Sequence, residues 1–394
     1  MWVKRRHRII VGFLKKFIFV YLKVRYKFTR DKKISIGKGS IILCNHTTTL
    51  DPFMVSMLFK ENLYFMASKD IFNHRFTGKL IKWLVNPIPK EKSKKSDISA
   101  VKNCMRVVKE GGNICIFPEG NRTFSGKLGN VDYSIVKLVK SLKVPLVICN
   151  INGGYPTDPR WGNTIRKGRV HAGFRRIYSY EEICDMDNDE LYKLIIENLT
   201  VDDFNFHPEY KGKYLAEDLE RVFYICPVCE AYHTISSAND KIYCTSCGLE
   251  VTYHKNLTFC PSDERFNFNN TSQWYDWQIA KIIEKEYNDD ELIYSDDIEL
   301  YLSIPFKSKQ LLIDGKVNMY GSYFEFMNEN DVVKLKFEDI SAVTLVGKKK
   351  MNIYVGDKTY QIFKTGKTNL LKYLHMYYVL ENKRNGGNYE FLGL

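Results

Sequence analysis

The stretch that decides the fold of this chain reads Asn45-His46-Thr47-Thr48-Thr49-Leu50-Asp51. The apolar run Ile41–Cys44 before it predicts a buried strand, and a helical pattern follows it over Pro52–Phe59. His46 therefore lies where a strand ends, and Asp51 lies where a helix begins. Because ligands gather at the carboxyl ends of strands in open α/β sheets, this position predicts a functional site. Asp51 also suits a helix N-cap, and a capped aspartate is rigid enough to orient a histidine.

A second stretch follows another predicted strand, Asn113–Phe117, and reads Phe117-Pro118-Glu119-Gly120-Asn121-Arg122-Thr123. Together the two stretches resemble the N-H-x4-D and F-P-E-G-T-R-S blocks of the glycerolipid acyltransferase family, which includes the 1-acylglycerol-3-phosphate acyltransferases. The first block matches fully, and the second departs at Asn121 and Thr123. The order and separation of the blocks also fit, and the resemblance covers roughly residues 34–205.

The resemblance implies an O-acyltransferase in which the acceptor hydroxyl attacks the acyl carbonyl directly. An alcohol needs a positioned base at neutral pH, and His46 can supply one because imidazole titrates near working pH. Asp51 would hold the His46 ring in the right tautomer. Arg122 would bind the acceptor phosphate, because its fork matches phosphate oxygens. Glu119 and Gly120 would shape that loop, with Glu119 positioning the acceptor or Arg122.

Two lysines are further candidate substrate-binding residues. Lys92 stands where a third family block usually ends in arginine, and a lysine is a point charge without a bidentate fork. Lys69 lies one position away from a lysine that the family usually carries before a helix. Both matches are displaced or substituted, so they imply weaker roles than the two main blocks do.

The implied acceptor is a lysophospholipid, first of all 1-acylglycerol 3-phosphate, which would give phosphatidate. Glycerol 3-phosphate or another lysolipid remains an alternative because of the departures at Ser68, Lys92 and Asn121. The implied donor is acyl-CoA, an acyl-carrier protein or an acyl phosphate. No catalytic cofactor is expected. The chain shows no G-x-S-x-G elbow, which agrees with a mechanism that forms no acyl-enzyme.

The basic character of the chain is concentrated at its N-terminus. The net charge is +13, and residues 1–33 contribute +11 of it with twelve Lys or Arg and one Asp. The apolar runs Ile9–Leu14 and Phe17–Leu22 are split by two lysines, so neither reaches the roughly 20 residues that span a bilayer. The lysines also argue against a signal peptide.

As a helix, residues 1–33 would place a stripe of apolar side chains at spacings of three or four. The stripe comprises Ile10, Phe13, Leu14, Phe17, Tyr21, Val24 and Phe28. The lysines largely off it are Lys15, Lys16, Lys23 and Lys27. This pattern is typical of an interfacial helix on an anionic membrane surface, and the alternative is a basic helix that packs on its own domain. We expect a peripheral membrane protein on the cytoplasmic face.

Strand and helix patterns alternate from residue 34 to residue 206, which predicts an α/β domain. The expected strands are Ile41–Cys44, Leu63–Met66, Asn113–Phe117, Leu146–Ile151 and Arg169–Phe174. The expected helices are Pro52–Phe59, Ile98–Glu110, Tyr133–Leu142 and Glu181–Leu199. A chain of 394 residues is too long for one core. We therefore expect further parts: a linker helix and zinc ribbon over 207–256, a linker with a helix over 257–300, and a β-rich domain over 301–394.

Four of the ten cysteines form a metal-binding pattern: Cys226, Cys229, Cys244 and Cys247. Two C-x2-C knuckles fourteen residues apart are typical of a four-cysteine zinc site. All four ligand positions are filled, so the predicted zinc is structural. The other six cysteines lie mostly in apolar runs, which suits reduced thiols in a reducing compartment.

The C-terminal part shows short strand patterns followed by a helix over Asn369–Glu381. This arrangement resembles a pleckstrin-homology or GRAM-like module. Lys348-Lys349-Lys350 would lie in a turn, either solvated or touching lipid headgroups.

A rival function is a non-catalytic zinc-ribbon protein that binds nucleic acid through its basic arm. Residues 226–248 carry Lys241 as their one basic residue, whereas counterion-release binding needs several. The N-terminal arm is rich in apolar residues at helical spacing, so nucleic acid is an unlikely partner. An inactive lipid-binding scaffold is a third possibility, but it would not require both His46 and Arg122.

Overall fold

The computed structural model describes residues 1–394 except 73–75, 92–96, 304–308, 365 and 387–394. The chain divides into two compact units. Among the described residues, unit 1 comprises 1–72, 76–91, 97–160 and 164–212, and unit 2 comprises 161–163, 213–303, 309–364 and 366–386. Each unit has its own sheets and its own hydrophobic core.

Unit 1 is built on a seven-stranded sheet in the order β1-β7-β6-β2-β5-β3-β4. The strands are β1 (Phe28–Arg30), β2 (Ile41–Cys44), β3 (Leu63–Ser68), β4 (Ile88–Lys90), β5 (Asn113–Ile116), β6 (Leu146–Asn152) and β7 (Val170–Tyr178). The run from β6 to β4 is parallel, whereas β7 pairs antiparallel with β6 and parallel with β1. The α/β fold predicted from the alternating pattern is therefore confirmed.

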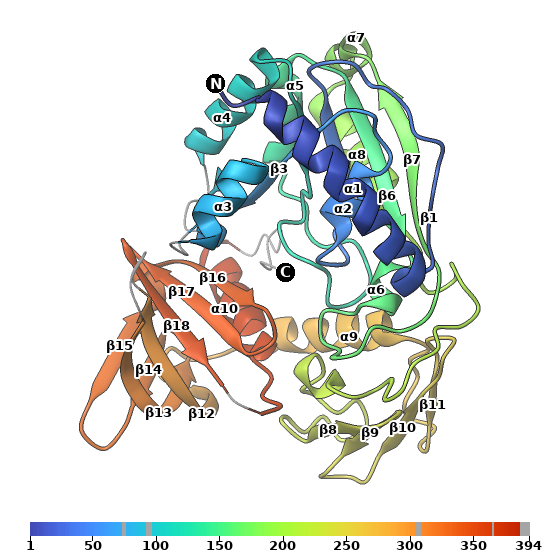
Figure 1. Ribbon diagram of the computed structural model, residues 1–394. Coiled ribbons are helices and arrows are strands. Elements are labelled where there is room, and N and C mark those ends of the chain that lie inside the picture. The colour runs from blue at the N-terminus through green and yellow to red at the C-terminus, as the bar shows by residue number, and fades with distance from the viewer. Residues whose placement is uncertain (73–75, 92–96, 304–308, 365, 387–394) are drawn as a thin grey trace. The chain divides into compact units, whose positions relative to one another are not determined.

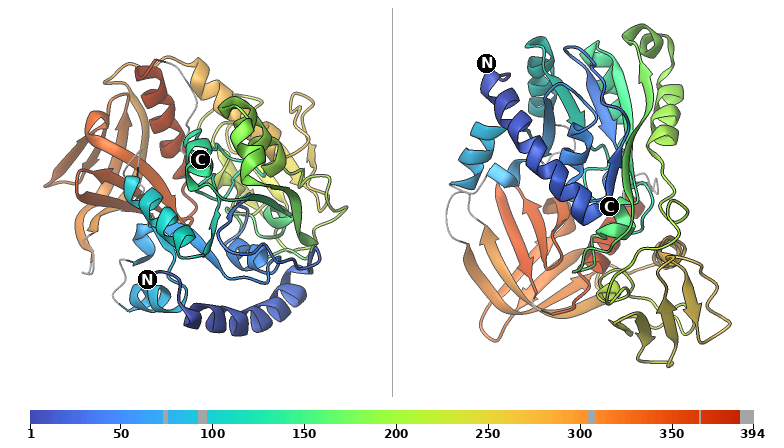
Figure 2. Two further views of the ribbon diagram at one scale, coloured as in Figure 1. Left: turned by 90° about the horizontal axis from the view of Figure 1, so that it is seen from above. Right: turned by 45° about the vertical axis from the view of Figure 1, so that its right-hand side comes forward.

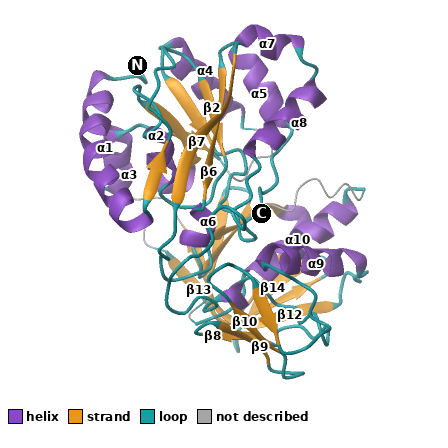
Figure 3. Ribbon diagram, turned by 90° about the vertical axis from the view of Figure 1, so that its right-hand side faces the viewer, coloured by secondary structure: helices purple, strands orange, loops and turns teal. Residues whose placement is uncertain are grey.

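Helices cover both faces of this sheet (Figure 1 and Figure 3). Along β2, Ile41 and Leu43 pack into one core cluster and Ile42 and Cys44 into the other, as the two-residue period of a strand requires. The first cluster is completed by α4 (Ile98–Lys109), α5 (Ser134–Leu142), α7 (Tyr180–Asp185) and α8 (Asn188–Leu199). The second is completed by α1 (Arg5–Tyr26) and α2 (Asp51–Ser56). A strand buried on both faces explains its unbroken apolar sequence.

Several local predictions in unit 1 are wrong. The helix expected over Glu181–Leu199 is two helices, because Met186 is extended and Asp187 caps α8 by accepting from Glu190 N at 2.7 Å. Phe28 leaves the helical stripe and lies buried in β1. Three elements were not predicted from the sequence: β4, α3 (Thr77–Leu84) and the single turn α6 (Gly154–Thr157).

Unit 2 contains a four-stranded antiparallel sheet in the order β11-β10-β9-β8. Its strands are β8 (Ile235–Ala238), β9 (Lys241–Cys244), β10 (Glu250–Tyr253) and β11 (Phe259–Pro261). The linker helix expected before it is wrong, since the described segment holds only the 3-10 turn η2 (Leu219–Arg221). Tyr214 and Asp218 both have positive φ there, which a helix does not tolerate.

The second sheet of unit 2 has seven antiparallel strands in the order β15-β14-β13-β12-β18-β17-β16. They are β12 (Leu292–Ser303), β13 (Gln310–Tyr320), β14 (Tyr323–Met327), β15 (Val332–Lys336), β16 (Ile340–Val346), β17 (Lys350–Val355) and β18 (Lys358–Phe363). Because β12 pairs with both β13 and β18, the expected linker over 257–300 is wrong beyond α9 (Thr271–Glu284). The helix α10 (Leu371–Arg384) follows the last strand.

The sequence predicts a β-rich domain over 301–394, whereas the sheet already begins with β12 at Leu292. The assignment of this part as a pleckstrin-homology or GRAM-like domain stays a prediction. Residues 371–380 of α10 are buried throughout, so this helix forms part of the core of unit 2. Of the lysine turn, Lys348 Nζ donates to Asn163 Oδ1 at 2.8 Å within the same unit.

Candidate active site

The site is centred on a hydrogen-bonded pair, His46 and Asp51, in the loop between β2 and α2. His46 Nδ1 lies 2.8 Å from Asp51 Oδ2, and the histidine side chain is 20% exposed whereas the aspartate is fully buried. Because a carboxylate oxygen accepts, the Nδ1 atom carries the proton. The other ring nitrogen, Nε2, is then the one that can take a proton from a substrate.

Asp51 is held by its own loop. The backbone N–H groups of Thr47 and Thr48 donate to Oδ2 at 2.6 and 2.9 Å, and Thr48 Oγ1 donates to Oδ1 at 2.7 Å. Asp51 is the first residue of α2 and the N-cap is Leu50, so the predicted N-cap role is wrong. The Asp51 carboxylate accepts from Thr47 and Thr48, which precede α2, and so it orders the loop before this helix. It does not cap the first turn of α2.

Glu119 ties the second sequence block to the first. Its Oε1 accepts from His46 N at 2.6 Å and its Oε2 accepts from Gly129 N at 2.7 Å. Thr123 N also donates to the carbonyl of His46 at 3.2 Å. Both backbone groups of His46 are therefore bonded to the loop that follows β5, the neighbour of β2 in the sheet.

Burial sets the electrostatics around this carboxyl. Desolvation raises the pKa of Glu119 to about 8, against the two backbone N–H groups that favour its charged form, and nearby Asp51 adds to the rise. A second buried carboxyl, Asp203, shows the same balance. Its pKa is raised to about 7 by burial, although Gly153 N and Tyr155 N donate to it at 2.6 and 3.1 Å.

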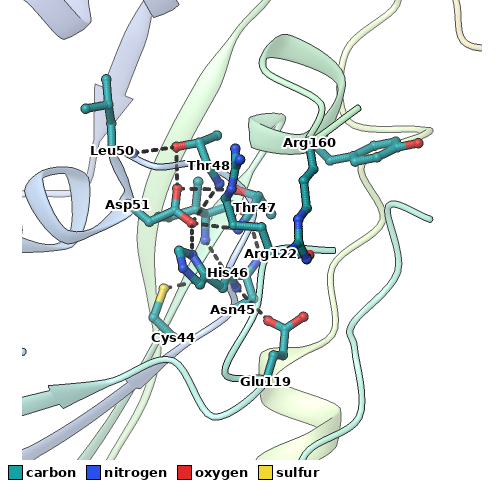
Figure 4. Close-up of polar contacts among 12 residues, drawn as sticks. Cys44, Asn45, His46, Thr47, Thr48, Leu50, Asp51, Glu119, Arg122 and Arg160 are labelled. Carbon is teal, nitrogen blue, oxygen red and sulfur yellow. Dashed lines mark hydrogen bonds and ion pairs between the residues drawn. The ribbon is translucent and has the colours of Figure 1, made fainter. Parts of the chain in front are cut away.

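Arg122 extends from the same loop as Glu119, and Figure 4 draws it beside His46 and Asp51. It is half-buried, and its carbonyl accepts from Arg160 Nη1 at 2.9 Å. Arg160 is itself buried, and its guanidinium lies 4.1 Å from the centre of the Phe124 ring. Arg160 therefore fixes the main chain from which Arg122 projects.

Aromatic rings continue the site along the sheet. The ring of Phe117 stacks on His46 with centroids 4.4 Å apart, and Phe65 of β3 stacks on Phe117 at 6.1 Å. The face of the imidazole therefore packs on the Phe117 ring, and its Nδ1 atom is hydrogen-bonded to Asp51.

Gly120 is required at its position by backbone conformation. It has a φ of +68°, and no atom would meet a Cβ there within 4 Å. The turn between Glu119 and Arg122 thus needs a residue that adopts positive φ without strain.

Comparisons with known proteins show which family this region resembles. Residues 25–152 match the family model described as Acyltransferase, and the match includes the His46–Asp51 loop and the loop from Glu119 to Arg122. The matched segment therefore contains both sequence blocks and resembles an acyltransferase domain.

Proteins of known name are similar to part of this chain. A Mycoplasma pneumoniae protein named "Probable 1-acyl-sn-glycerol-3-phosphate acyltransferase" is 21% identical over 197 residues, which is 48% of this chain and 67% of that protein. The chloroplastic 1-acyl-sn-glycerol-3-phosphate acyltransferase BAT2 of Brassica napus is 25% identical over 166 residues, 41% of this chain and 46% of that protein. The Bacillus subtilis enzyme of the same activity name is 23% identical and matched over 53% of its length.

Among solved structures, the 1-acyl-sn-glycerophosphate acyltransferase PlsC of Thermotoga maritima is similar with a TM-score of 0.40 and 20% identity, covering 48% of this chain and 75% of that one. The chain thus spans between about half and two thirds of the curated relatives described above. Together, the family match and the relatives support an acyltransferase enzyme.

Of the two lysine candidates, Lys69 stands apart from this network. Lys69 follows β3, is 60% exposed, and forms an ion pair with Glu91 at 2.9 Å. Lys92 lies outside the described residues. The structure therefore adds no support for either as a substrate-binding residue.

Several residues that build the candidate site were not predicted from the sequence. Asn45 pairs with the backbone of Ile151 through two bonds of 2.9 and 2.8 Å, which joins the end of β2 to β6. Thr47 and Thr48 lie inside the first block, where two hydroxyl residues before an aspartate are a readable signal. Arg160 belongs to neither block, and no spacing rule points to it.

The four predicted metal ligands lie together in unit 2. Their sulfur atoms are all within 4.8 Å of one another. Cys226 and Cys247 are 3.7 Å apart, as are Cys229 and Cys244. Of the remaining cysteines, Cys184 and Cys260 are exposed and the others are buried.

The N-terminal helix α1 has two different faces. Leu22 and Tyr26 are buried in unit 1, and Lys15 Nζ donates to the carbonyls of Phe59 and Glu61, both at 3.3 Å. Burial lowers the pKa of Lys15 to about 8. The other face exposes apolar residues, among them Phe13 and Phe17. Among the described residues, we find no helix with the length and apolar character needed to cross a bilayer.

Proposed function

We propose that this protein transfers a fatty acyl chain from a thioester or acyl phosphate to the hydroxyl of a lysophospholipid. The observation that carries the proposal is the 2.8 Å bond between His46 and Asp51, next to a loop that presents Arg122 and is bonded to the backbone of His46. We take 1-acylglycerol 3-phosphate as the acceptor, because the similar proteins are named for it.

In the proposed reaction, His46 Nε2 takes the proton of the acceptor hydroxyl while the oxygen attacks the acyl carbonyl. The tetrahedral intermediate then collapses, the ester bond forms, and the bond to sulfur or phosphate oxygen breaks. The imidazolium then gives up its proton to the departing thiolate or, with an acyl phosphate donor, to the departing phosphate. Asp51 stabilises the positive ring between these two transfers, as the aspartate of a catalytic triad does.

Arg122 is proposed to hold the acceptor phosphate. A guanidinium offers two parallel N–H groups to phosphate oxygens, and Arg160 fixes the main chain from which this side chain extends. Glu119 has both oxygens on backbone amides. We therefore assign it to positioning His46 rather than to binding the acceptor.

The lipid nature of the acceptor fits a membrane-associated enzyme. We propose that the exposed apolar face of α1 lies on an anionic membrane surface on the cytoplasmic side, because basic residues flank it and because interfacial helices combine these features.

The cysteine cluster is proposed to hold one structural zinc ion. Four sulfurs at about 2.3 Å from a tetrahedral zinc lie roughly 3.8 Å apart, and the two pairs measured here are 3.7 Å apart. The zinc would stabilise the small four-stranded sheet and take no part in acyl transfer.

A substrate panel tests the proposal directly. Purified full-length protein is given acyl-CoA, acyl-carrier protein and acyl phosphate donors with lysophosphatidate, other lysolipids and glycerol 3-phosphate, and products are identified by mass. We expect phosphatidate from lysophosphatidate. Product from glycerol 3-phosphate alone would change the acceptor, and no acylated product with any pair would contradict the proposal.

A further inference from the structure

The second exposed apolar helix of unit 1 is α3, which follows β3 and the 3-10 turn η1 (Lys69–Phe72). Phe76, Leu80 and Trp83 lie on one side of it at helical spacing, and each is more than half exposed. The one buried residue of α3 is Gly78. The backbone of Phe72 packs so closely on it that a Cβ there would lie 2.5 Å from the carbonyl oxygen of Phe72. An eight-residue helix that turns its large apolar side chains outward gains little from its own domain.

Helix α3 is fixed against the N-terminal end of α1. The Arg6 guanidinium lies 5.2 Å from the centre of the Trp83 ring, and Trp2 Nε1 donates to the carbonyl of Asn86 at 2.9 Å, just beyond α3. Both helices belong to unit 1, and they lie side by side in Figure 1 and Figure 2.

The exposed stripe of α1 runs on the side where these contacts occur. Its members, each more than half exposed, are Ile9, Phe13, Phe17, Val20 and Val24. With about 3.6 residues per turn, Arg6 falls on the same arc of the helix as Phe13 and Phe17. The ring of Trp83 therefore lies at the N-terminal end of the α1 stripe, and the two stripes are continuous.

We propose that α3 is a second membrane-contacting element, so that Phe76, Leu80 and Trp83 enter the headgroup–acyl boundary together with the α1 stripe. This inference rests on the proposed membrane association of α1. The partner is an anionic bilayer surface, because exposed Lys79 and Lys82 flank the α3 stripe, and a tryptophan beside basic residues suits that boundary.

The position of α3 relative to the candidate active site suggests a route by which a lipid acceptor could reach that site. Strand β3 carries Phe65, the outer ring of the stack that supports His46, and is followed at once by η1; α3 begins at Thr77. A lipid surface at α3 would thus lie at the end of the strand that borders the candidate active site, where an acceptor supplied by the bilayer could enter.

The test uses full-length protein and vesicles of phosphatidylglycerol and phosphatidylcholine, with binding measured by sedimentation. Leu80→Ser/Trp83→Ser should weaken partitioning by about tenfold or more, because two apolar side chains no longer leave water. The matched control is Ile177→Thr, which removes a half-exposed apolar side chain from β7 and keeps a β-branched residue. It should bind as the wild type does.

A second measurement does not depend on the folding of the double variant. Brominated lipids should quench the fluorescence of the wild type more than that of Trp83→Phe, which keeps an apolar ring. Equal quenching in both proteins would overturn the role of α3.

The outcomes separate this inference from the membrane proposal. If Phe13→Ser/Phe17→Ser releases the protein while the α3 variant binds normally and Trp83 is not quenched, α3 is not a membrane element and the membrane proposal stands. If the wild type does not bind vesicles at all, both fail. Self-association of the wild type that the α3 variant abolishes, without quenching, would assign the stripe to a second copy of the chain.

Discussion

One carboxyl oxygen of Glu119 accepts the backbone N–H of His46 at 2.6 Å, and the other accepts from Gly129 N at 2.7 Å. These bonds connect the loop after β5 to the residue that we propose as the base. The glutamate of the second sequence block therefore acts on the reaction through the position of His46.

Glu119→Gln should lower turnover about tenfold to a hundredfold, because an amide NH2 cannot accept from one of the two backbone donors. The free energy of unfolding should fall by about 1–3 kcal/mol. The control is Glu61→Gln, since Glu61 also accepts a backbone N–H, from Ile36 at 3.2 Å, in the same unit. It should lose stability without a matching loss of turnover, and equal turnover losses in both variants would contradict a positioning role for Glu119.

The raised pKa values of Glu119 and Asp203 predict a pH dependence of stability. In the folded protein these groups bind protons up to about pH 8 and 7, whereas their ordinary pKa values are 4.5 and 3.8. The folded state holds more protons in this window, so their contribution to the free energy of unfolding falls as pH rises. Urea unfolding at several pH values checks this.

The quantity to compare is the difference in unfolding free energy between wild type and Glu119→Gln at each pH. Taking this difference cancels the titration of all groups that the two proteins share. This difference should shrink from about pH 4.5 to pH 8 and then level. A difference that grows with pH would show that the two backbone N–H groups outweigh desolvation and that the pKa of Glu119 is lowered.

Arg122→Lys should raise the Michaelis constant for a phosphorylated acceptor about fivefold or more, with a smaller change in turnover number, because a point charge replaces a bidentate fork. Steady-state kinetics with saturating donor measure this. Arg106→Lys is the control, since Arg106 is an exposed arginine that pairs with Glu110. An unchanged acceptor Michaelis constant in Arg122→Lys would move the phosphate site elsewhere.

Elemental analysis should find one zinc per chain. Cys244→Ser should lose most of it and loosen unit 2, because a sheet with so few apolar residues relies on its metal. Cys260→Ser, which changes an exposed cysteine of the same sheet outside the cluster, should keep the metal. A wild type without zinc, or with a disulfide in either knuckle, would refute the assignment.

The position of the site could be read from the sequence because its two blocks follow strands that are neighbours in the sheet. Runs such as Ile41–Cys44 are apolar throughout, which identifies buried strands, and loops at the carboxyl ends of adjacent parallel strands must meet. The hydrogen-bond partners of the residues in those loops could not be predicted from the sequence. That Glu119 faces His46 N, and that Arg160 reaches the carbonyl of Arg122, depends on side-chain directions that only the packed structure fixes.

The C-terminal half shows a different limit. Residues 292–303 form a strand, but the pair Asp296-Asp297 interrupts their apolar alternation and an acidic run precedes them, so the sequence reads as a linker. Tyr294, Ile298 and Leu300 are nevertheless buried. Asp296 is tolerated because Lys372 pairs with it at 2.7 Å across the core of unit 2, a contact between residues far apart in sequence.

The most direct test of the account is the turnover of His46→Ala, measured by mass with lysophosphatidate and the best donor. Loss of the base should lower turnover about a thousandfold, and Asp51→Asn should also lose most activity while the protein stays folded. His171→Ala is the matched control, because His171 also pairs with an aspartate, Asp31, at 3.3 Å in the same unit. We predict normal turnover for His171→Ala and almost none for His46→Ala; near-normal turnover in folded His46→Ala would contradict the proposed mechanism.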